Sequence, residues 1–142
     1  MNLTVELPPI DRRLDVNNGN WNKLARACAV KKARSLASLL TLEAMMNAGV
    51  KRGHMKPRFV LVTTNWYRHR VDYDNRLANV KAYQDGVFDA VGANDKEVVA
   101  GCSLLRHLPK GRACDHLSVC MQLFEERAEF LAALNEGLGI GG

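Results

Sequence analysis

Two aspartates separated by a single residue, Asp72 and Asp74, are the side chains of this sequence best suited to hold a metal ion. They follow a run of β-branched and aromatic residues over 58–67, which predicts a mostly buried strand. In extended geometry a spacing of two puts both carboxylates on the same side of the chain. Paired hard oxygen ligands of this kind suit Mg²⁺ or Mn²⁺.

A helix predicted over residues 74–91 brings further polar groups toward the same site. Lys81 and Asp85 follow Asp74 by seven and eleven residues, offsets that return to within about 20° of its direction on a helix. An adjacent face is apolar and can pack on a sheet, with Leu77, Val80, Val87, Phe88 and Val91. Asp95 comes after the helix, and we expect it to fold back toward the strand edge that carries Asp72 and Asp74.

The same spacings also have a simpler interpretation. A pair of aspartates in a loop fits a solvated turn, and a lysine four residues before an aspartate fits a weak surface ion pair. Spacing alone therefore leaves both interpretations open.

The rest of the chain predicts one α/β (α+β) domain over residues 1–142, with a mixed sheet and packed helices. Strands are expected at 3–7, 58–67, 98–108 and 116–123, and helices at 20–47, 74–91 and 125–134. The expected order of elements is β-α-β-α-β-β-α. Pro8-Pro9 ends the first strand, and Gly49 and Gly53 end the first helix.

Composition narrows the partners and the compartment. A net charge of +5 and a pI near 9.2 favour an acidic partner such as nucleic acid. No apolar run approaches the ~20 residues of a membrane helix, and the first residues lack a signal-peptide pattern, so a cytoplasmic location without membrane contact is expected. The cysteines form no CxxC pair and are expected to be buried thiols, although Cys114, His116 and Cys120 leave a soft-metal site as an alternative.

The acidic segment and the residues on its carboxyl side resemble the RusA-type Holliday-junction resolvases. The shared pattern is D-x-D-N, a lysine, D-G, a hydrophobic helix and an aspartate before a valine-rich strand. In this sequence the pattern consists of Asp72, Asp74-Asn75, Lys81, Asp85-Gly86, Asn94-Asp95 and Val98-Val99. The resemblance covers the chain to about Leu123, and residues 124–142 lie outside it.

The resemblance implies roles for individual residues. Asp72, Asp74 and Asp95 match the family's essential acidic positions and would be catalytic metal ligands, and Lys81 matches its essential lysine. Asp85 is expected to orient Lys81, and Asn75 to cap the helix or hold a metal-bound water. The chain departs from many members in having Ala78 where they place the lysine, and Asn94 in place of the first aspartate of a doublet.

The function implied by the resemblance is that of a Mg²⁺-dependent endodeoxyribonuclease, with Mn²⁺ as an alternative ion. Such an enzyme is a homodimer that nicks two opposing strands of a four-way junction during DNA recombination and repair, in a bacterium or a phage-infected bacterial cell. Basic side chains would contact the DNA phosphates. The candidates are Lys23, Arg26, Lys31, Lys32, Arg68, Arg70, Lys110 and Arg112.

Three alternatives remain open. The departures at Asn94 and Lys81 motivate a nucleic-acid-binding protein that no longer catalyses. A nuclease that acts on flaps, replication forks or RNA would carry the same metal site. A basic interaction module would bind no Mg²⁺ at all.

Overall fold

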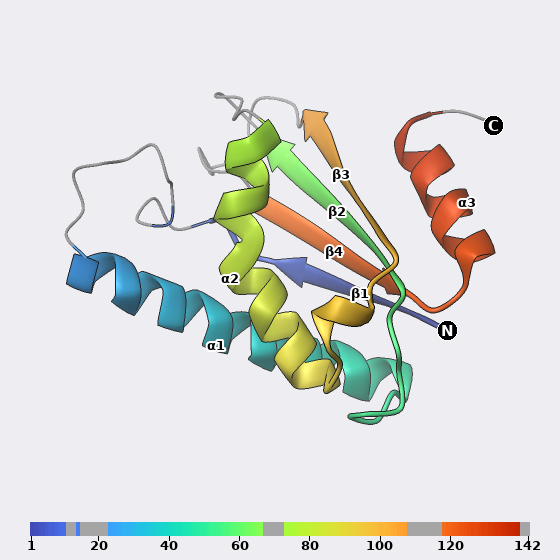
Figure 1. Cartoon of the computed structure of the whole chain (residues 1–142), viewed down its shortest axis with the longest axis horizontal. Coiled ribbons are helices and arrows are strands. Elements are labelled where there is room, and N and C mark those ends of the chain that lie inside the picture. The colour runs from blue at the N-terminus through green and yellow to red at the C-terminus, as the bar shows by residue number, and fades with distance from the viewer. Residues whose placement is uncertain (11–13, 15–22, 67–72, 108–117, 140–142) are drawn as a thin grey trace.

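The computed structural model describes residues 1–10, 14, 23–66, 73–107 and 118–139 of the chain. They form a small α+β domain with a four-stranded mixed sheet and three α-helices, in the predicted order (Figure 1). The elements are β1 (Asn2–Leu7), α1 (Lys23–Ala48), β2 (Phe59–Trp66), α2 (Tyr73–Val91), the 3₁₀-helix η2 (Asp95–Glu97), β3 (Ala100–His107), β4 (Ser118–Phe124) and α3 (Arg127–Gly137).

The sheet has the strand order β1-β4-β2-β3. β4 pairs antiparallel with both β1 and β2, whereas β3 pairs parallel with β2. A parallel pair needs a long crossover connection, and α2 provides it. Consequently the amino end of α2 lies at the carboxyl ends of β2 and β3, and the carboxyl end of α2 returns to the strands' amino ends (Figure 1).

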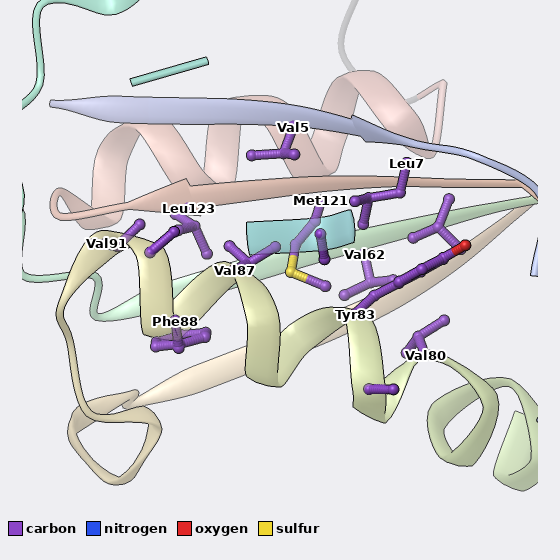
Figure 2. Close-up of a cluster of buried hydrophobic side chains, with 14 of the residues drawn as sticks. Val5, Leu7, Val62, Val80, Tyr83, Val87, Phe88, Val91, Met121 and Leu123 are labelled. Atoms are coloured by element: carbon purple, nitrogen blue, oxygen red, sulfur yellow. The ribbon is translucent and has the colours of Figure 1, made fainter. Parts of the chain in front are cut away.

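Helices α1 and α2 cover one face of this sheet. Alternate residues of β1 are buried there (Leu3, Val5 and Leu7), as the period of two in a half-buried strand requires. Figure 2 shows the centre of the resulting core, in which side chains of α2 meet Val62, Met121 and Leu123 of the sheet. The phenolic oxygen of Tyr83 lies 3.1 Å from the carbonyl oxygens of both Pro8 and Pro9, so its polar end is satisfied within the core.

The two helices cross at very close range. Every fourth residue of α1 is buried, and most are small: Ala29, Ala33, Ala37, Thr41 and Met45. A Cβ atom at Gly86 of α2 would collide with the carbonyl oxygen of Arg34 and would lie 2.9 Å from Cβ of Ala37. The glycine of the Asp85-Gly86 pair therefore has a packing reason: it permits the backbones of α1 and α2 to touch.

Helix α3 covers part of the opposite face with a much smaller apolar cluster. Leu61, Phe124 and Phe130 form its buried centre. The Phe130 ring stacks on Phe59 at a centroid distance of 5.2 Å and meets Phe124 edge-on at 5.9 Å.

Candidate functional site

The predicted acidic site falls at the carboxyl end of β2, where the chain enters α2. Asp74 is the second residue of α2 and Asn75 the third, so the helix begins within one residue of the predicted start. A helix amino terminus carries partial positive charge and favours anionic groups, whether carboxylates or phosphates. Asp72 and the side chains of Asp74 and Asn75 lie outside the described residues.

Lys81 is exposed on α2, and its Nζ atom lies 3.0 Å from Oδ1 of Asp85. The four-residue spacing predicted this contact. Asp85 is one turn further from the amino end of α2 than Lys81, so the ammonium group is directed away from Asp74 in this arrangement. Because the pair is solvent-exposed, it contributes little to the stability of the fold and is easily broken.

Asp85 belongs to a longer series of charges at the helix crossing. Nε of Arg34 on α1 donates a 2.6 Å hydrogen bond to Oδ2 of Asp89, and Nη2 of Arg52 lies 3.3 Å from the carbonyl oxygen of Asp89. The hydrogen bond from Arg34 is the main cause that lowers the pKa of Asp89 from its ordinary value. The same hydrogen bond is the main cause that raises the pKa of Arg34, and the negative charge of Asp85 adds to it. Lys81, Asp85, Arg34, Asp89 and Arg52 thus alternate in sign along the outside of the crossing.

All of these charged residues except Lys81 line a shallow polar cleft of about 490 Å³ at the carboxyl end of α2. Its lining consists of Arg34, Arg52, Asp85, Phe88, Asp89, Gly92, Ala93, Asn94 and Asp95. The roles of Arg52 and Asp89 were not predicted from the sequence. The spacing of Lys81, Asp85 and Asp89 at four-residue intervals was the signal that could have indicated a charged helix face.

Asp95 lies in this cleft and not beside Asp74. It is the first residue of η2, where the Asn94 side chain accepts a 3.0 Å hydrogen bond from the backbone N–H of Lys96 and caps the turn. We expected Asp95 to fold back to the end of the strand that precedes Asp74. This expectation is wrong, because the two residues of one chain lie at opposite ends of the sheet. The 19-residue helix α2 lies between them and spans roughly 27 Å at its rise per residue. The residues just before β3 are at the amino ends of the parallel strands, opposite the end that carries Asp74 (Figure 1).

The basic residues of α1 divide between two sides of the helix. Lys23, Arg26, Lys31 and Arg34 line a shallow groove together with Ala27 and Val30. Nη2 of Arg26 also lies 3.4 Å from the carbonyl oxygen of Leu14. Lys32 is exposed but does not belong to this lining. Arg68, Arg70, Lys110 and Arg112 lie outside the described residues.

The chemistry of the described residues gives limited support to a metal centre. Within the described ranges no group of three histidine, cysteine or acidic side chains could hold an ion. Carboxylates at Asp72 and Asp74 would suit a hard divalent cation by donor type, and they fall outside that search. For the soft-metal alternative, Cys114 and His116 also lie outside the described residues. Burial, reinforced by Glu6, raises the pKa of Cys120 to about 12, which disfavours the thiolate that binds zinc.

Comparison with known proteins adds little to this geometry. No family model matches the chain, and no curated protein matches it. Solved structures of the hydrogenase maturation protein HypE are similar at 15% identity and a TM-score of 0.35, with 87% of this chain and 29% of that chain covered. HypE of E. coli is 16% identical with a TM-score of 0.25, and the match covers 47% of this chain and 19% of that chain. HypE in complex with ATP is 14% identical with a TM-score of 0.29, and the match covers 87% of this chain and 28% of that chain. The chain thus spans less than a third of the length of these proteins, and similarity at this level carries no argument about function.

No helix in the described part of the chain is long and apolar enough to cross a membrane.

Proposed function

We propose that this chain is a metal-dependent endodeoxyribonuclease that cleaves four-way DNA junctions. The observation that carries the proposal is the position of Asp74, in the first turn of α2 at the carboxyl end of the parallel β2–β3 pair, seven residues before Lys81. Ligand sites of open α/β sheets lie outside the carboxyl ends of their strands. Asp72 precedes Asp74 by two residues in the sequence, and the exposed Lys81 lies about two turns further along α2.

In this proposal Asp72 and Asp74 would hold Mg²⁺, or Mn²⁺ in its place. The bound ion would supply an activated water and stabilise the negative charge that develops on the phosphate. Lys81 would leave its ion pair with Asp85 and bind a phosphate oxygen of the DNA instead. Its positive charge would then lie beside the scissile bond. Asp85 would hold the lysine when DNA is absent, and Asn75 would support the metal or its water.

The basic groove of α1 supports binding to a phosphate backbone. Four of its six lining residues are basic, and all six belong to α1. Phosphate contacts of this kind position DNA without reading its sequence. Arg68 and Arg70, which precede Asp72 in the sequence, and Lys110, Arg112 and Lys32 are further proposed contacts. The proposal places the protein in the cytoplasm of a bacterial or phage-infected cell, in recombination and repair, and acting as a homodimer.

The second candidate is a nucleic-acid-binding protein without nuclease activity. The separation of Asp95 from Asp74 favours it, because one chain by itself does not bring the third acidic residue to the other two. Under the first candidate, Asp95 can serve the same ion as Asp74 only if it comes from another copy of the chain.

The test is nicking of an end-labelled four-way junction beside a linear duplex and a flap, with Mg²⁺, Mn²⁺ or EDTA. We expect paired, metal-dependent nicks in the junction, which are lost in Asp74→Asn and retained in Glu136→Gln, a control that neutralises a carboxylate on α3. Binding of the junction without cleavage in any metal would exclude the enzyme and support the second candidate. Cleavage of flaps or of RNA alone would keep the enzyme and change its substrate.

A further inference from the structure

A polar cluster lies on the sheet face that α3 partly covers, beyond the apolar cluster around Phe130. Leu61 of β2 and Leu104 of β3 belong to that apolar cluster. Side chains two or four residues further along a strand point to the same face, so Asn65 and Arg106 lie on this face as well. The two residues are register partners near the carboxyl end of the parallel β2–β3 pair. The polar cluster is therefore at the end of the sheet where α2 begins.

Asn65 is the centre of this cluster and is only 4% exposed. Its Nδ2 donates a 3.1 Å hydrogen bond to Oγ of Ser118 on β4, and its Oδ1 accepts a 2.8 Å hydrogen bond from Nε of Arg106. Because a guanidinium can only donate, the oxygen of the amide must be the atom that faces Arg106. A buried amide with partners on both sides has a fixed orientation. Asn65 therefore fixes the position of Nε of Arg106.

Arg106 offers more hydrogen-bond donors than Asn65 uses. A guanidinium has five N–H groups in a planar fork, and the bond to Asn65 uses the one on Nε. The others belong to the two terminal nitrogens, for which the described part of the chain has no further hydrogen-bond partner. Arg106 is exposed, so a ligand can reach these donors from solvent. A partner that served Asn65 alone would need one donor and no charge.

The positive charge of Arg106 is not neutralised nearby. Within the described ranges no carboxylate forms an ion pair with it. Burial, reinforced by Glu6, raises the pKa of Cys120 on β4 to about 12, and the charge of Arg106 opposes this rise. β2 lies between β3 and β4, so the guanidinium extends from the edge strand over β2. An unpaired, oriented guanidinium at this place is suited to an anion.

We propose that Arg106 binds a backbone phosphate of the DNA next to the phosphate that is cleaved, and that Asn65 positions its guanidinium for this contact. The step rests on the proposed nuclease. The edge formed by the two terminal nitrogens of an arginine matches two oxygens of a phosphate. Arg106 lies near the carboxyl end of β3, and Asp74 is in the first turn of α2, which begins at the same end of the sheet on its other face (Figure 1). A DNA strand that passes over this end of the sheet meets both residues.

Binding in the absence of metal tests this contact separately from cleavage. A fluorescent four-way junction is titrated in EDTA at several KCl concentrations with the wild type, Arg106→Gln and Arg58→Gln. Arg58 is the matched control, because it is exposed and directly precedes β2 at the opposite end of the sheet. In Arg106→Gln the logarithmic salt dependence of binding should become shallower by about 0.9, the value for one duplex phosphate, and in Arg58→Gln it should not change. An unchanged salt dependence in Arg106→Gln would overturn the proposal.

Two further variants separate a positioning role of Asn65 from a purely structural one. Asn65→Leu removes the acceptor and keeps the charge of Arg106, so affinity for the junction should fall about fivefold while the salt dependence stays near that of the wild type. Ser118→Ala removes the other partner of Asn65 and should leave the affinity unchanged. Wild-type affinity in Asn65→Leu, or an equal loss in Ser118→Ala, would overturn the positioning role.

Arg106→Lys decides if Asn65→Leu fails to fold. Lysine keeps the positive charge but has no planar fork and cannot bind two phosphate oxygens side by side. We expect this variant to bind the junction about threefold more weakly than the wild type, with a similar salt dependence. Equal affinity of Arg106→Lys and the wild type would contradict a bidentate contact fixed by Asn65.

Junctions with one uncharged methylphosphonate at a time locate the bound phosphate. At the phosphate that Arg106 contacts, the modification should weaken binding by the wild type and have no further effect on Arg106→Gln. This position should lie beside the mapped nick, and a position distant from the nick would contradict the proposed placement.

The outcomes for Arg106 and for the nuclease can be told apart. A shallower salt dependence in Arg106→Gln, in a protein that cleaves no DNA, would refute the nuclease and leave the phosphate contact standing. Metal-dependent nicking together with an unchanged salt dependence in Arg106→Gln would refute the contact and leave the nuclease standing. A wild type that does not bind the junction would overturn both.

Discussion

The two faces of the sheet differ in how tightly their helices are held. On one face α1 and α2 share a continuous core that reaches from Leu3 to Leu123, and their backbones touch at Gly86. On the other face α3 rests on a small cluster centred on Phe130. A helix fixed by backbone contact has one position, whereas a helix resting on a few side chains can shift to fill a gap. The face that presents the proposed site is therefore the rigid one, which is what a precise arrangement of ligands requires.

Equivalent leucine truncations on the two faces should show the largest difference. Leu123→Ala removes a fully buried side chain from the α1/α2 core, where the neighbours cannot close in, and should cost about 4 kcal/mol of unfolding free energy. Leu61→Ala, on the adjacent strand but facing α3, should cost about 2 kcal/mol because α3 can move toward the sheet. Urea unfolding of both variants measures this, and equal costs would show that α3 is held as firmly as α2.

The second largest difference in stability should separate two glycine-to-alanine changes, one in α2 and one in α3. A Cβ at Gly86 would meet the backbone oxygen of Arg34, which cannot move without separating α1 from α2, so Gly86→Ala should cost about 2 kcal/mol despite better helix propensity. A Cβ at Gly137 would meet Cδ1 of Leu104 at 2.5 Å, the end of a side chain that can rotate. Gly137→Ala should therefore be nearly neutral. Thermal unfolding of the pair tests this, and a stable Gly86→Ala variant would contradict the close crossing.

The smallest effect concerns the ion pair on the outside of the crossing. Arg34 lowers the pKa of Asp89 below its ordinary value of 3.8, so the pair stabilises the fold above that value and its contribution is lost as the pH falls through the lowered pKa. Both side chains are about half exposed, and solvent screening keeps the contribution small. Asp89→Asn should lower the urea midpoint slightly at neutral pH, and the difference from the wild type should disappear in acid. A stability difference that grows in acid would contradict the lowered pKa of Asp89. Glu136→Gln, which neutralises a carboxylate on α3, serves as the control.

The sequence predicted the order of the elements and the bounds of α2, because apolar residues recurring at helical spacing specify which face packs and where the pattern ends. It also predicted the contact between Lys81 and Asp85, which depends only on local helix geometry. It misplaced Asp95, because separation along the chain does not say whether a helix carries a residue toward a site or away from it. The charges of Arg34 and Arg52 around Asp89 were missed for a related reason: they come from segments that only the helix crossing brings together.

The pairing of β1 with β4 also constrains the order of folding during synthesis. Asn2 is opposite Phe124, and Leu7 is opposite Val119, so β1 is synthesised long before the strand with which it pairs. The parallel β2–β3 pair likewise forms only after α2 has been made. Contacts this distant along the chain close slowly, because the intervening loop must lose entropy first. The apolar residues of β1 therefore lack their strand partner until β4 has been synthesised.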